Sequence, residues 1–470
     1  MRVRNGKETL GGNMEKHLSE MTFPELTAEK GIRCSCGRVH RCGLKWFRAG
    51  KGVIEELPAM LERCGRKYPM VVMDPNTKKA AGDCVMQILD EAGIRYKVHV
   101  FPVKGKMEPD EYAMGSLAMA ADPSCDVFLA VGSGVINDCC RVMAYASGKT
   151  SMAVCTAPSM DGYCSGSSSM ILNHMKVSLY DGCPEGILAD TDILATAPDR
   201  MLQAGLGDML AKYVAVCEWR ISHIVAGETY CEEIADMVRA SVKKIVSEAD
   251  GLMQRRPEAL TAVIEGLVLS GMAMALAEIS RPASGLEHYF SHFWEMQALQ
   301  RGEDSDLHGI QVGIGTLLTI WLYEQFLKTE CPDTEKARRK MSEFSDEAWE
   351  TSVREIFGSM ADSIFETERI AGKNLPETQK KHLERIVSHW DEIQRIIREE
   401  LPSMETVRDI MLRCGLPVKP SQIGISHEET VNALVGSRDM RDKYMTSSLL
   451  WDLGLLDEAA QKMRVTEEIL

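Results

Sequence analysis

The stretch that decides the expected fold is Asp126-Val-Phe-Leu-Ala-Val131, which runs directly into Gly132-Ser-Gly134-Val-Ile-Asn-Asp138. A short apolar run that ends at glycines and continues into a helical stretch is typical of a parallel strand followed by a helix. Glycines at such a turn let the backbone approach a pyrophosphate, and the helix N-terminus offers free N–H groups. The third glycine of the Gly-x-Gly-x-x-Gly fingerprint is missing, since Asn137 occupies that position. Taken alone, the stretch fits ordinary turn chemistry as well as a nucleotide-binding loop.

The same alternation of short strands and helices extends from about Lys51 to Leu194. It predicts βαβ units and a mainly parallel sheet. The other strands that we expect lie at 70–73, 96–101 and 151–155, with helices over 80–92 and 136–147 and a smaller strand pair at 177–180 and 187–189.

The pattern changes from about Ala197, where helical stretches follow one another with few β-branched runs between them. The fold class predicted is therefore an α/β nucleotide-binding domain with a parallel sheet, followed by an all-α domain. We expect the helices over 205–216, 231–249, 257–279, 286–300, 309–326 and 375–399. The expected boundaries are 1–45 for a Cys-rich extension, 46–195 for the α/β domain and 196–470 for the helical domain.

Size, charge and cysteine content restrict the class of protein. A chain of 470 residues is longer than a single hydrophobic core usually accommodates, which favours two domains. The net charge of -15 argues against a nucleic-acid-binding surface. Fifteen scattered cysteines, an odd number, argue against a disulfide framework. Residues 1–30 lack the apolar stretch of a signal peptide, and we expect no run of the roughly 18–20 apolar residues that cross a bilayer. The expectation is a reduced, cytoplasmic protein, and a homo-oligomer is compatible with it.

A second polar loop follows the next expected strand, in the sequence Thr156-Ala-Pro-Ser-Met-Asp161-Gly-Tyr-Cys-Ser165. Its hydroxyls and its carboxylate suit contacts to a ribose or to a nicotinamide amide. The alternative is an ordinary turn built on Asp-Gly. Two such loops at consecutive strand ends favour one shared cleft, because open parallel sheets bind ligands at the carboxyl ends of their strands.

The helical half contains a group of residues with metal-ligand chemistry. Asp208 follows two glycines at an expected helix start, His288 and His292 share one helical face, and His308 opens a long apolar helix. One carboxylate and two imidazoles with an open position suit a catalytic divalent ion, of which Zn²⁺ is the simplest choice and Fe²⁺ or Ni²⁺ are alternatives. Such an ion polarises a carbonyl oxygen. The structural alternatives are an N-cap aspartate and packing histidines.

Taken together, these motifs resemble the sn-glycerol-1-phosphate dehydrogenase family, within the iron-containing alcohol dehydrogenase and dehydroquinate synthase-like superfamily. The resemblance covers about Lys51 to Leu455. The motifs Gly-Ser-Gly-Val-Ile-Asn-Asp, Thr-Ala-Pro-Ser-Met-Asp-Gly, Gly-Leu-Gly-Asp and Ser-Gly-Leu-Glu-His-x-x-x-His occur in the family's order, and Arg441-Asp-Lys-Tyr444 and Leu449–Gly454 also look like it.

The resemblance implies reversible reduction of dihydroxyacetone phosphate to sn-glycerol 1-phosphate with NAD or NADP. It implies a divalent ion held by Asp208, His288 and His308, so that the helical domain carries metal and substrate, with Asp161 and His292 facing a small phosphorylated substrate. The residues implied to contact NAD(P) are Asp74, Gly134, Val135, Ile136, Asn137, Asp138, Thr156, Ala157, Pro158, Ser159 and Ser165.

Several points depart from this pattern or stay open. The family often has Glu after His-Gly, where this chain has Ile310, so the surroundings of His308 are in question. A glycerol or other polyol dehydrogenase of the same superfamily is the nearest alternative, and a non-catalytic nucleotide-binding protein is a more distant one. A phosphorylated substrate requires cations, for which Lys212 is a candidate or a plain surface residue. In the extension, a small zinc site and free thiols are the alternatives for Cys34, Cys36, His40 and Cys42.

Overall fold

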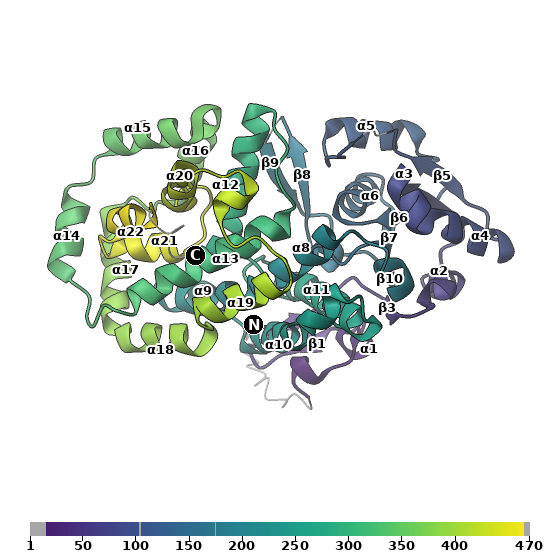
Figure 1. The fold of residues 1–470 in the computed structure, drawn as a ribbon, viewed down its shortest axis with the longest axis horizontal. Helices are drawn as coiled ribbons and strands as arrows, with labels where there is room; N and C mark the ends of the chain where they lie inside the picture. The colour runs from purple at the N-terminus through teal and green to yellow at the C-terminus, as the bar shows by residue number, and fades with distance from the viewer. Residues whose placement is uncertain (1–15, 103–104, 174, 465–470) are drawn as a thin grey trace, which may run out of the picture.

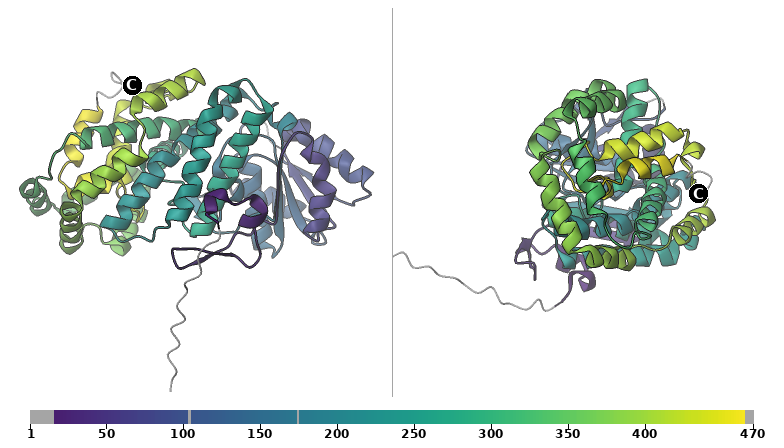
Figure 2. Two further views of the ribbon diagram at one scale, coloured as in Figure 1. Left: turned by 90° about the horizontal axis from the view of Figure 1, so that it is seen from below. Right: turned by 90° about the vertical axis from the view of Figure 1, so that its left-hand side faces the viewer.

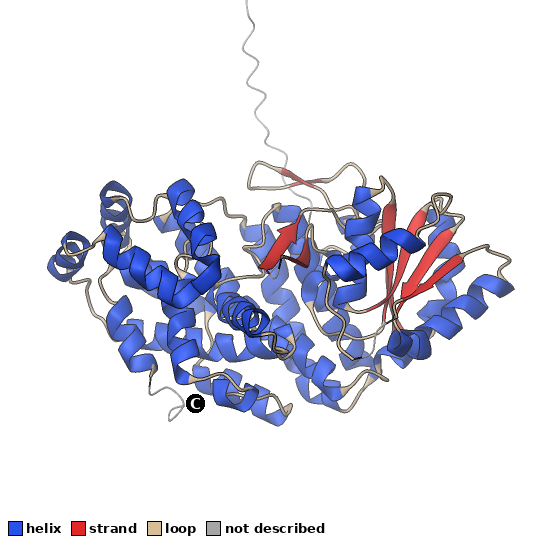
Figure 3. Cartoon of the chain, turned by 90° about the horizontal axis from the view of Figure 1, so that it is seen from above, coloured by secondary structure: helices blue, strands red, loops and turns tan. Residues whose placement is uncertain are grey.

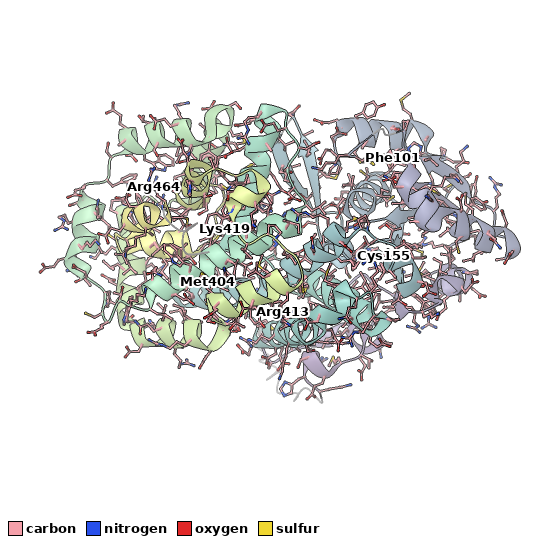
Figure 4. The ribbon with its side chains drawn as sticks, viewed as in Figure 1. Phe101, Cys155, Met404, Arg413, Lys419 and Arg464 are labelled. Atoms are coloured by element: carbon pink, nitrogen blue, oxygen red, sulfur yellow. The ribbon has the colours of Figure 1, made fainter. Side chains whose placement is uncertain are left out.

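The structure is a computed structural model that describes residues 16–102, 105–173 and 175–464, arranged as a sheet-bearing half and a helical half (Figure 1). Phe101 and Cys155 lie in the sheet-bearing half, whereas Met404 and Arg413 lie on α19 in the helical half (Figure 4).

The central sheet has six parallel strands, seen together in Figure 3. Both of its faces are covered. One face packs, through side chains such as Phe128 and Ala153, on α6 and the helical half, and the other packs, through side chains such as Leu129 and Val154, on α2 and α4. In spatial order the strands are β3 (Trp46–Gly50), β10 (Gly186–Asp190), β7 (Thr150–Cys155), β6 (Val127–Gly132), β4 (Pro69–Met73) and β5 (Lys97–Val100).

The expected α/β fold with a parallel sheet is therefore confirmed, but the predicted small strand pair at 177–180 and 187–189 is wrong. The second run is β10, which is buried along its whole length and lies inside the main sheet between β3 and β7. The first belongs to β9 (Met175–Leu179), which pairs antiparallel with β8 (Ser168–Leu172). A fully apolar run fits a strand covered on both faces, whereas an alternating run fits a hairpin with one exposed face.

The helices of the sheet-bearing half follow its strands along the chain, and the last of them, α7, leads into the helical half. They are α2 (Leu57–Arg63), α3 (Pro75–Thr77), a π-helical turn (Lys78–Gly82), α4 (Asp83–Glu91), α5 (Glu111–Ala120), α6 (Gly134–Ala146) and α7 (Thr191–Leu194). Ahead of the sheet, α1 (Phe23–Leu26) and a hairpin of β1 (Ile32–Arg33) and β2 (Val39–His40) lie against α10 and α11. Figure 2 shows this N-terminal segment beside the long helices.

The described part of the chain from Thr191 onward contains helices and connecting loops only, as expected. The remaining helices are α8 (Asp199–Leu210), α9 (Lys212–Val225), α10 (Glu232–Met253), α11 (Pro257–Ala277), α12 (Leu286–Arg301), α13 (His308–Phe326), α14 (Thr334–Ser342), α15 (Asp346–Phe357), α16 (Ala361–Ala371), α17 (Pro376–Ser388), α18 (Trp390–Glu400), α19 (Met404–Arg413), α20 (His427–Ser437), α21 (Thr446–Asp452) and α22 (Leu456–Met463).

Helix α11 corrects one expectation. Its 21 residues, with a mean hydropathy of 1.8 over the most apolar window, are long and apolar enough to cross a membrane, although no run of this kind was expected. In the structure 72% of that window is buried inside the protein, where α11 packs against α10. Length and apolarity alone do not separate a core helix from a membrane helix.

Candidate active site

A cleft of about 1550 Å³ lies where the carboxyl ends of β4, β6 and β7 face α12 and α13. The chain leaves β4 to form β5 on one side and later returns to form β6 on the other. The cleft therefore begins at the switch point of strand order, where open α/β sheets bind ligands. Its walls include nine of the residues expected to contact the nucleotide, namely Asp74, Gly134, Val135, Ile136, Asp138, Thr156, Ala157, Ser159 and Ser165.

Two residues expected to contact the nucleotide, Asn137 and Pro158, are not among the residues that line the cleft. Asn137 points inward from α6 and is only 1% exposed. The carbonyl oxygen of Pro158 lies so close to Gly205 that a Cβ there would be 1.9 Å from it. A loop motif identified in sequence includes residues that face the ligand and residues that support the loop from behind.

Arg141 on α6 fixes the polar loop that follows β7. Its side chain is 1% exposed, and its Nη2 donates to the Asp181 carboxylate at 2.6 Å and to the Ser165 carbonyl at 2.7 Å. Its Nη1 donates to the Gly162 carbonyl at 3.0 Å. The guanidinium thus replaces the water that these buried backbone oxygens would otherwise require.

We expect Arg141→Met to lower the free energy of unfolding by about 3–5 kcal/mol, because it leaves the buried Asp181 carboxylate without its ion partner. The matched control is Arg395→Met, which removes an exposed ion pair with Glu399 within one helix and should cost less than about 0.5 kcal/mol. Denaturant unfolding of both variants measures the difference. Equal, small losses would show that Arg141 does not hold the loop.

Close approach of two helices brings the predicted ligands together. A Cβ on Gly207 would lie 2.2 Å from the Gly309 carbonyl oxygen, and a Cβ on Gly309 would lie 1.9 Å from the Ala204 carbonyl oxygen. Backbone therefore meets backbone where α8 crosses the start of α13, a contact that only glycine allows. Asp208 lies within α8 and is fully buried, so the expected position at a helix start is wrong.

Asp208 belongs to a buried polar cluster. Lys212 Nζ donates to Asp208 Oδ1 at 2.8 Å and lies 2.8 Å from Asp161 Oδ2. Asp208 Oδ2 accepts from the backbone N–H of Asp161 at 2.9 Å, and Asp208 Oδ1 lies 3.6 Å from His288 Nε2. Burial opposes the charge on Asp208, but the Lys212 ammonium, His288 and His308 together outweigh it and hold the pKa of Asp208 below its usual range.

His288 and His308 are each held through Nδ1 by a buried glutamate. Glu287 Oε1 lies 2.8 Å from His288 Nδ1. His308 Nδ1 lies 3.3 Å from Glu295 Oε1 and also shares a hydrogen bond of 3.0 Å with Ser291 Oγ. The ring centroids of the two histidines are 5.2 Å apart. A carboxylate at Nδ1 fixes the proton there and leaves Nε2 as a lone-pair donor, the usual arrangement around metal-bound histidines.

His292 is different, because its buried Nδ1 has no hydrogen-bond partner among the residues that the structure describes. Burial, followed by the neighbouring His308, holds the pKa of His292 well below its usual range. Its ring lines the cleft and stacks on His308 with centroids 5.6 Å apart. His292, Glu295 and His308 also lie close enough to share one ion. Glu295 is paired with Lys176 at 2.5 Å, as Asp208 is paired with Lys212, so ion pairing does not separate the two candidate ligand sets.

The sequence analysis did not identify Glu287 and Glu295 as site residues, although their positions relative to His288 gave a partial signal. Glu287 directly precedes His288, and Glu295 lies two helical turns after it on the same face of α12. Ile310, which stands where a glutamate was expected, is fully buried. Glu295 supplies a carboxylate to His308 from a different helix.

The cations at the cleft also differ from the expectation. Lys212 is fully buried in its pairs with Asp161 and Asp208, so it is not a surface residue and does not line the cleft. Lys176, Arg441 and Lys443 do line it. Lys443 Nζ donates to Ser280 Oγ at 2.7 Å and lies 5.8 Å from the ring centre of Tyr289, which in turn is 5.9 Å from His292.

The fold thus combines a parallel sheet whose edge carries polar loops with a helical half that contributes a buried polar centre to the same cleft. Residues 48–198 match the family model described as iron-containing alcohol dehydrogenase. A glycerol dehydrogenase from Schizosaccharomyces pombe shares the fold, with a TM-score of 0.57 over 91% of each chain at 17% identity.

More specific relatives are named glycerol-1-phosphate dehydrogenase [NAD(P)+]. The protein of Halalkalibacterium halodurans is 29% identical over 87% of this chain and 93% of its own length. That of Bacillus velezensis is 34% identical over 59% and 71%, and that of Pyrococcus horikoshii is 32% identical over 58% and 77%. The chain belongs to this glycerol-1-phosphate dehydrogenase family.

Proposed function

We propose that the protein interconverts dihydroxyacetone phosphate and sn-glycerol 1-phosphate with NAD(P) and one divalent metal ion. The observation that carries this proposal is that His288 lies 3.6 Å from Asp208 and packs against His308, beside a cleft whose opposite wall is formed by the loops expected to contact the nucleotide. Free cysteines throughout the chain fit a reducing, cytoplasmic setting.

The proposed metal ligands are Asp208 Oδ1 and the Nε2 atoms of His288 and His308. The 3.6 Å between Asp208 Oδ1 and His288 Nε2 is near the roughly 3.4 Å that separates two ligands of one tetrahedral ion. The glutamates at both Nδ1 atoms favour these histidines over His292. When bound, a divalent ion at this place would polarise the oxygen on C2 of the substrate.

The nucleotide would lie along the carboxyl edge of the sheet. The N-terminus of α6 would face its pyrophosphate, because the first N–H groups of a helix are free to donate. Asp74 after β4 and the Thr156–Ser165 loop after β7 would flank it. On this proposal, the side of the cleft near α12 would hold the nicotinamide, which when bound would supply the hydride for reduction and accept it in oxidation.

His292 is the proposed proton relay. Reduction of a ketone adds a hydride to carbon and a proton to oxygen, so the site requires a group that carries protons. His292 lines the cleft, burial holds its pKa well below the usual range, and its Nδ1 has no hydrogen-bond partner in the described part of the chain. It would accept a proton from the alcohol during oxidation and return one during reduction.

The substrate phosphate is proposed to bind Arg441 and Lys443. Both line the cleft, and the Tyr289 ring centroid lies 5.8 Å from Lys443 Nζ and 5.9 Å from the His292 ring centroid. Two cations match a phosphate dianion, whereas an uncharged polyol has no need of them. This observation favours the phosphorylated substrate over glycerol.

The test is NAD(P)H oxidation with dihydroxyacetone phosphate after chelation, with Zn²⁺, Ni²⁺ and Fe²⁺ added back separately. We expect turnover to disappear on chelation and to return with at least one of the three ions. Turnover that survives complete removal of divalent metal would exclude the proposed mechanism.

Lys443→Met should raise the KM for dihydroxyacetone phosphate about tenfold to a hundredfold, because this is the contribution of one charge-assisted hydrogen bond to binding. The KM for unphosphorylated dihydroxyacetone serves as the internal control and should change less than about twofold. Parallel losses with both substrates would place Lys443 outside the phosphate site.

The same residue predicts a pH dependence. Burial, together with Arg281 and Arg441, lowers the pKa of Lys443 to about 7, against the opposing effect of Glu228 and Glu287. The cation is thus present below pH 7 and lost above it, while the phosphate becomes a dianion above about pH 6. We expect kcat/KM for dihydroxyacetone phosphate to fall above pH 7, and the fall to move to higher pH in Lys443→Arg. An unchanged profile in that variant would assign the fall to another group.

A further inference from the structure

A second group of metal-ligating side chains lies outside the cleft, where the N-terminal hairpin meets α10. It consists of Cys34, Cys36, His40 and Cys231, whose ligand atoms all lie within 4.8 Å of one another. Cys34 and Cys36 precede β2, His40 ends β2, and Cys231 immediately precedes α10. The hairpin protrudes from the body of the molecule and carries two very short strands (Figure 3).

The separations within this group match those of a tetrahedral zinc site. Cys34 Sγ lies 3.5 Å from Cys231 Sγ. His40 Nε2 lies 3.3 Å from Cys36 Sγ and 3.6 Å from Cys231 Sγ. Zinc–sulfur and zinc–nitrogen bonds of about 2.3 and 2.0 Å place two tetrahedral ligands about 3.5–3.8 Å apart. Three sulfurs and one imidazole are a common ligand set for structural zinc.

His40 is oriented for this role from outside the group. Its Nδ1 lies 2.7 Å from the carbonyl oxygen of Leu276, near the end of α11. A carbonyl only accepts, so Nδ1 carries the proton and Nε2 presents its lone pair to the sulfurs. His40 is 3% exposed and Cys231 is 5% exposed, which gives the group a protected interior side.

We propose that Cys34, Cys36, His40 and Cys231 bind a structural zinc ion that fastens the N-terminal hairpin to α10 and α11. A hairpin with two residues in each strand cannot stabilise itself. A closed site of four protein ligands, without an open position, would supply stability rather than catalysis.

The ligand set differs from the four residues that stand together in sequence. Cys42 lies elsewhere, 3.8 Å from the Sγ atoms of both Cys164 and Cys183. The fourth ligand, Cys231, is separated from Cys34 by nearly two hundred residues. The Cys-x-Cys spacing is tighter than the two-residue gap that is usual in zinc sites. Here the hairpin turn supplies only two sulfurs, those of Cys34 and Cys36, and the third comes from Cys231.

The proposed site has two alternatives, which are a disulfide between Cys34 and Cys231 and an ion held by Cys42, Cys164 and Cys183.

Cobalt substitution of the full-length protein distinguishes the proposed site from both alternatives, because thiolate-to-cobalt charge transfer absorbs in the near ultraviolet. The proposed active-site ligands contain no sulfur, so this absorption reports a cysteine site alone. The variants are Cys36→Ser, Cys231→Ser and Cys42→Ser, with the exposed Cys84→Ser as the matched control.

We expect the charge-transfer band in the wild type, Cys84→Ser and Cys42→Ser, and its loss or marked weakening in Cys36→Ser and Cys231→Ser. Protein purified with zinc should contain about one ion per chain less in Cys36→Ser than in the wild type. Cys36 is exposed, so its replacement tests the site without disturbing the core. The proposal is overturned by a wild type without the band, by loss of the band in Cys42→Ser alone, or by a Cys34–Cys231 disulfide in freshly purified protein.

Discussion

Asp208→Asn is expected to abolish retention of the active-site metal and to lower kcat/KM for dihydroxyacetone phosphate by about 10³-fold or more. The substitution keeps the shape of the side chain but removes its charge. It leaves the buried Lys212 paired with Asp161 alone, and it offers the ion a neutral oxygen in place of a carboxylate. Metal analysis by mass spectrometry and steady-state kinetics measure the two effects.

Two controls separate a lost ligand from a lost fold. His389→Ala removes an exposed imidazole outside the cleft and should change neither metal content nor rate. Asp208→Asn is expected to lack the active-site metal, so its thermal unfolding is compared with that of the metal-free wild type. A similar unfolding temperature shows that the buried amide leaves the fold intact. An Asp208→Asn protein that retains metal and rate would refute the proposed ligand set.

His292→Asn is expected to lower kcat by about 10²–10⁴-fold while the metal content stays at the wild-type level, which is the range for loss of a general acid–base group. The physical reason is that His292 lines the cleft but, unlike His288 and His308, has no carboxylate at its Nδ1 within residues 16–102, 105–173 and 175–464. The variant therefore distinguishes a proton relay from a ligand. Metal loss equal to that of Asp208→Asn would instead make His292 part of the ligand set with Glu295 and His308.

Sequence patterns predicted the class of fold because strand and helix periods are local properties. The turn after β6, the change to helices near Ala197 and the order of the loops follow from neighbouring residues. The position of β10 does not, since an apolar run carries no information about which strand it joins. The edge strand β3 lies next to β10 and was also missed, because its mixed run Trp46–Gly50 lacks a clear period of two.

In the candidate site, too, residues identified by local sequence features were predictable, whereas their partners from distant parts of the chain were not. Residue types and spacing made Asp208, His288 and His308 possible ligands, and the resemblance to the family selected them over His292. The partners that orient them depend on tertiary contacts. Glu295 on α12 contacts His308 on α13. Lys443 lines the same cleft although it follows His308 by more than a hundred residues. Lys212 was interpretable only once its burial was known, because the same spacing places a lysine on a surface as readily as beside Asp208.

The most direct test of the proposed function is NAD(P)⁺ reduction by the metal-loaded protein with sn-glycerol 1-phosphate, sn-glycerol 3-phosphate and glycerol in parallel. The Arg441 and Lys443 site predicts that glycerol is the poorer substrate, and the family assignment predicts the sn-1 phosphate as the preferred enantiomer. We expect kcat/KM for sn-glycerol 1-phosphate to exceed both others by about a hundredfold or more. Equal or faster turnover of glycerol, or a preference for sn-glycerol 3-phosphate, would contradict the proposed function.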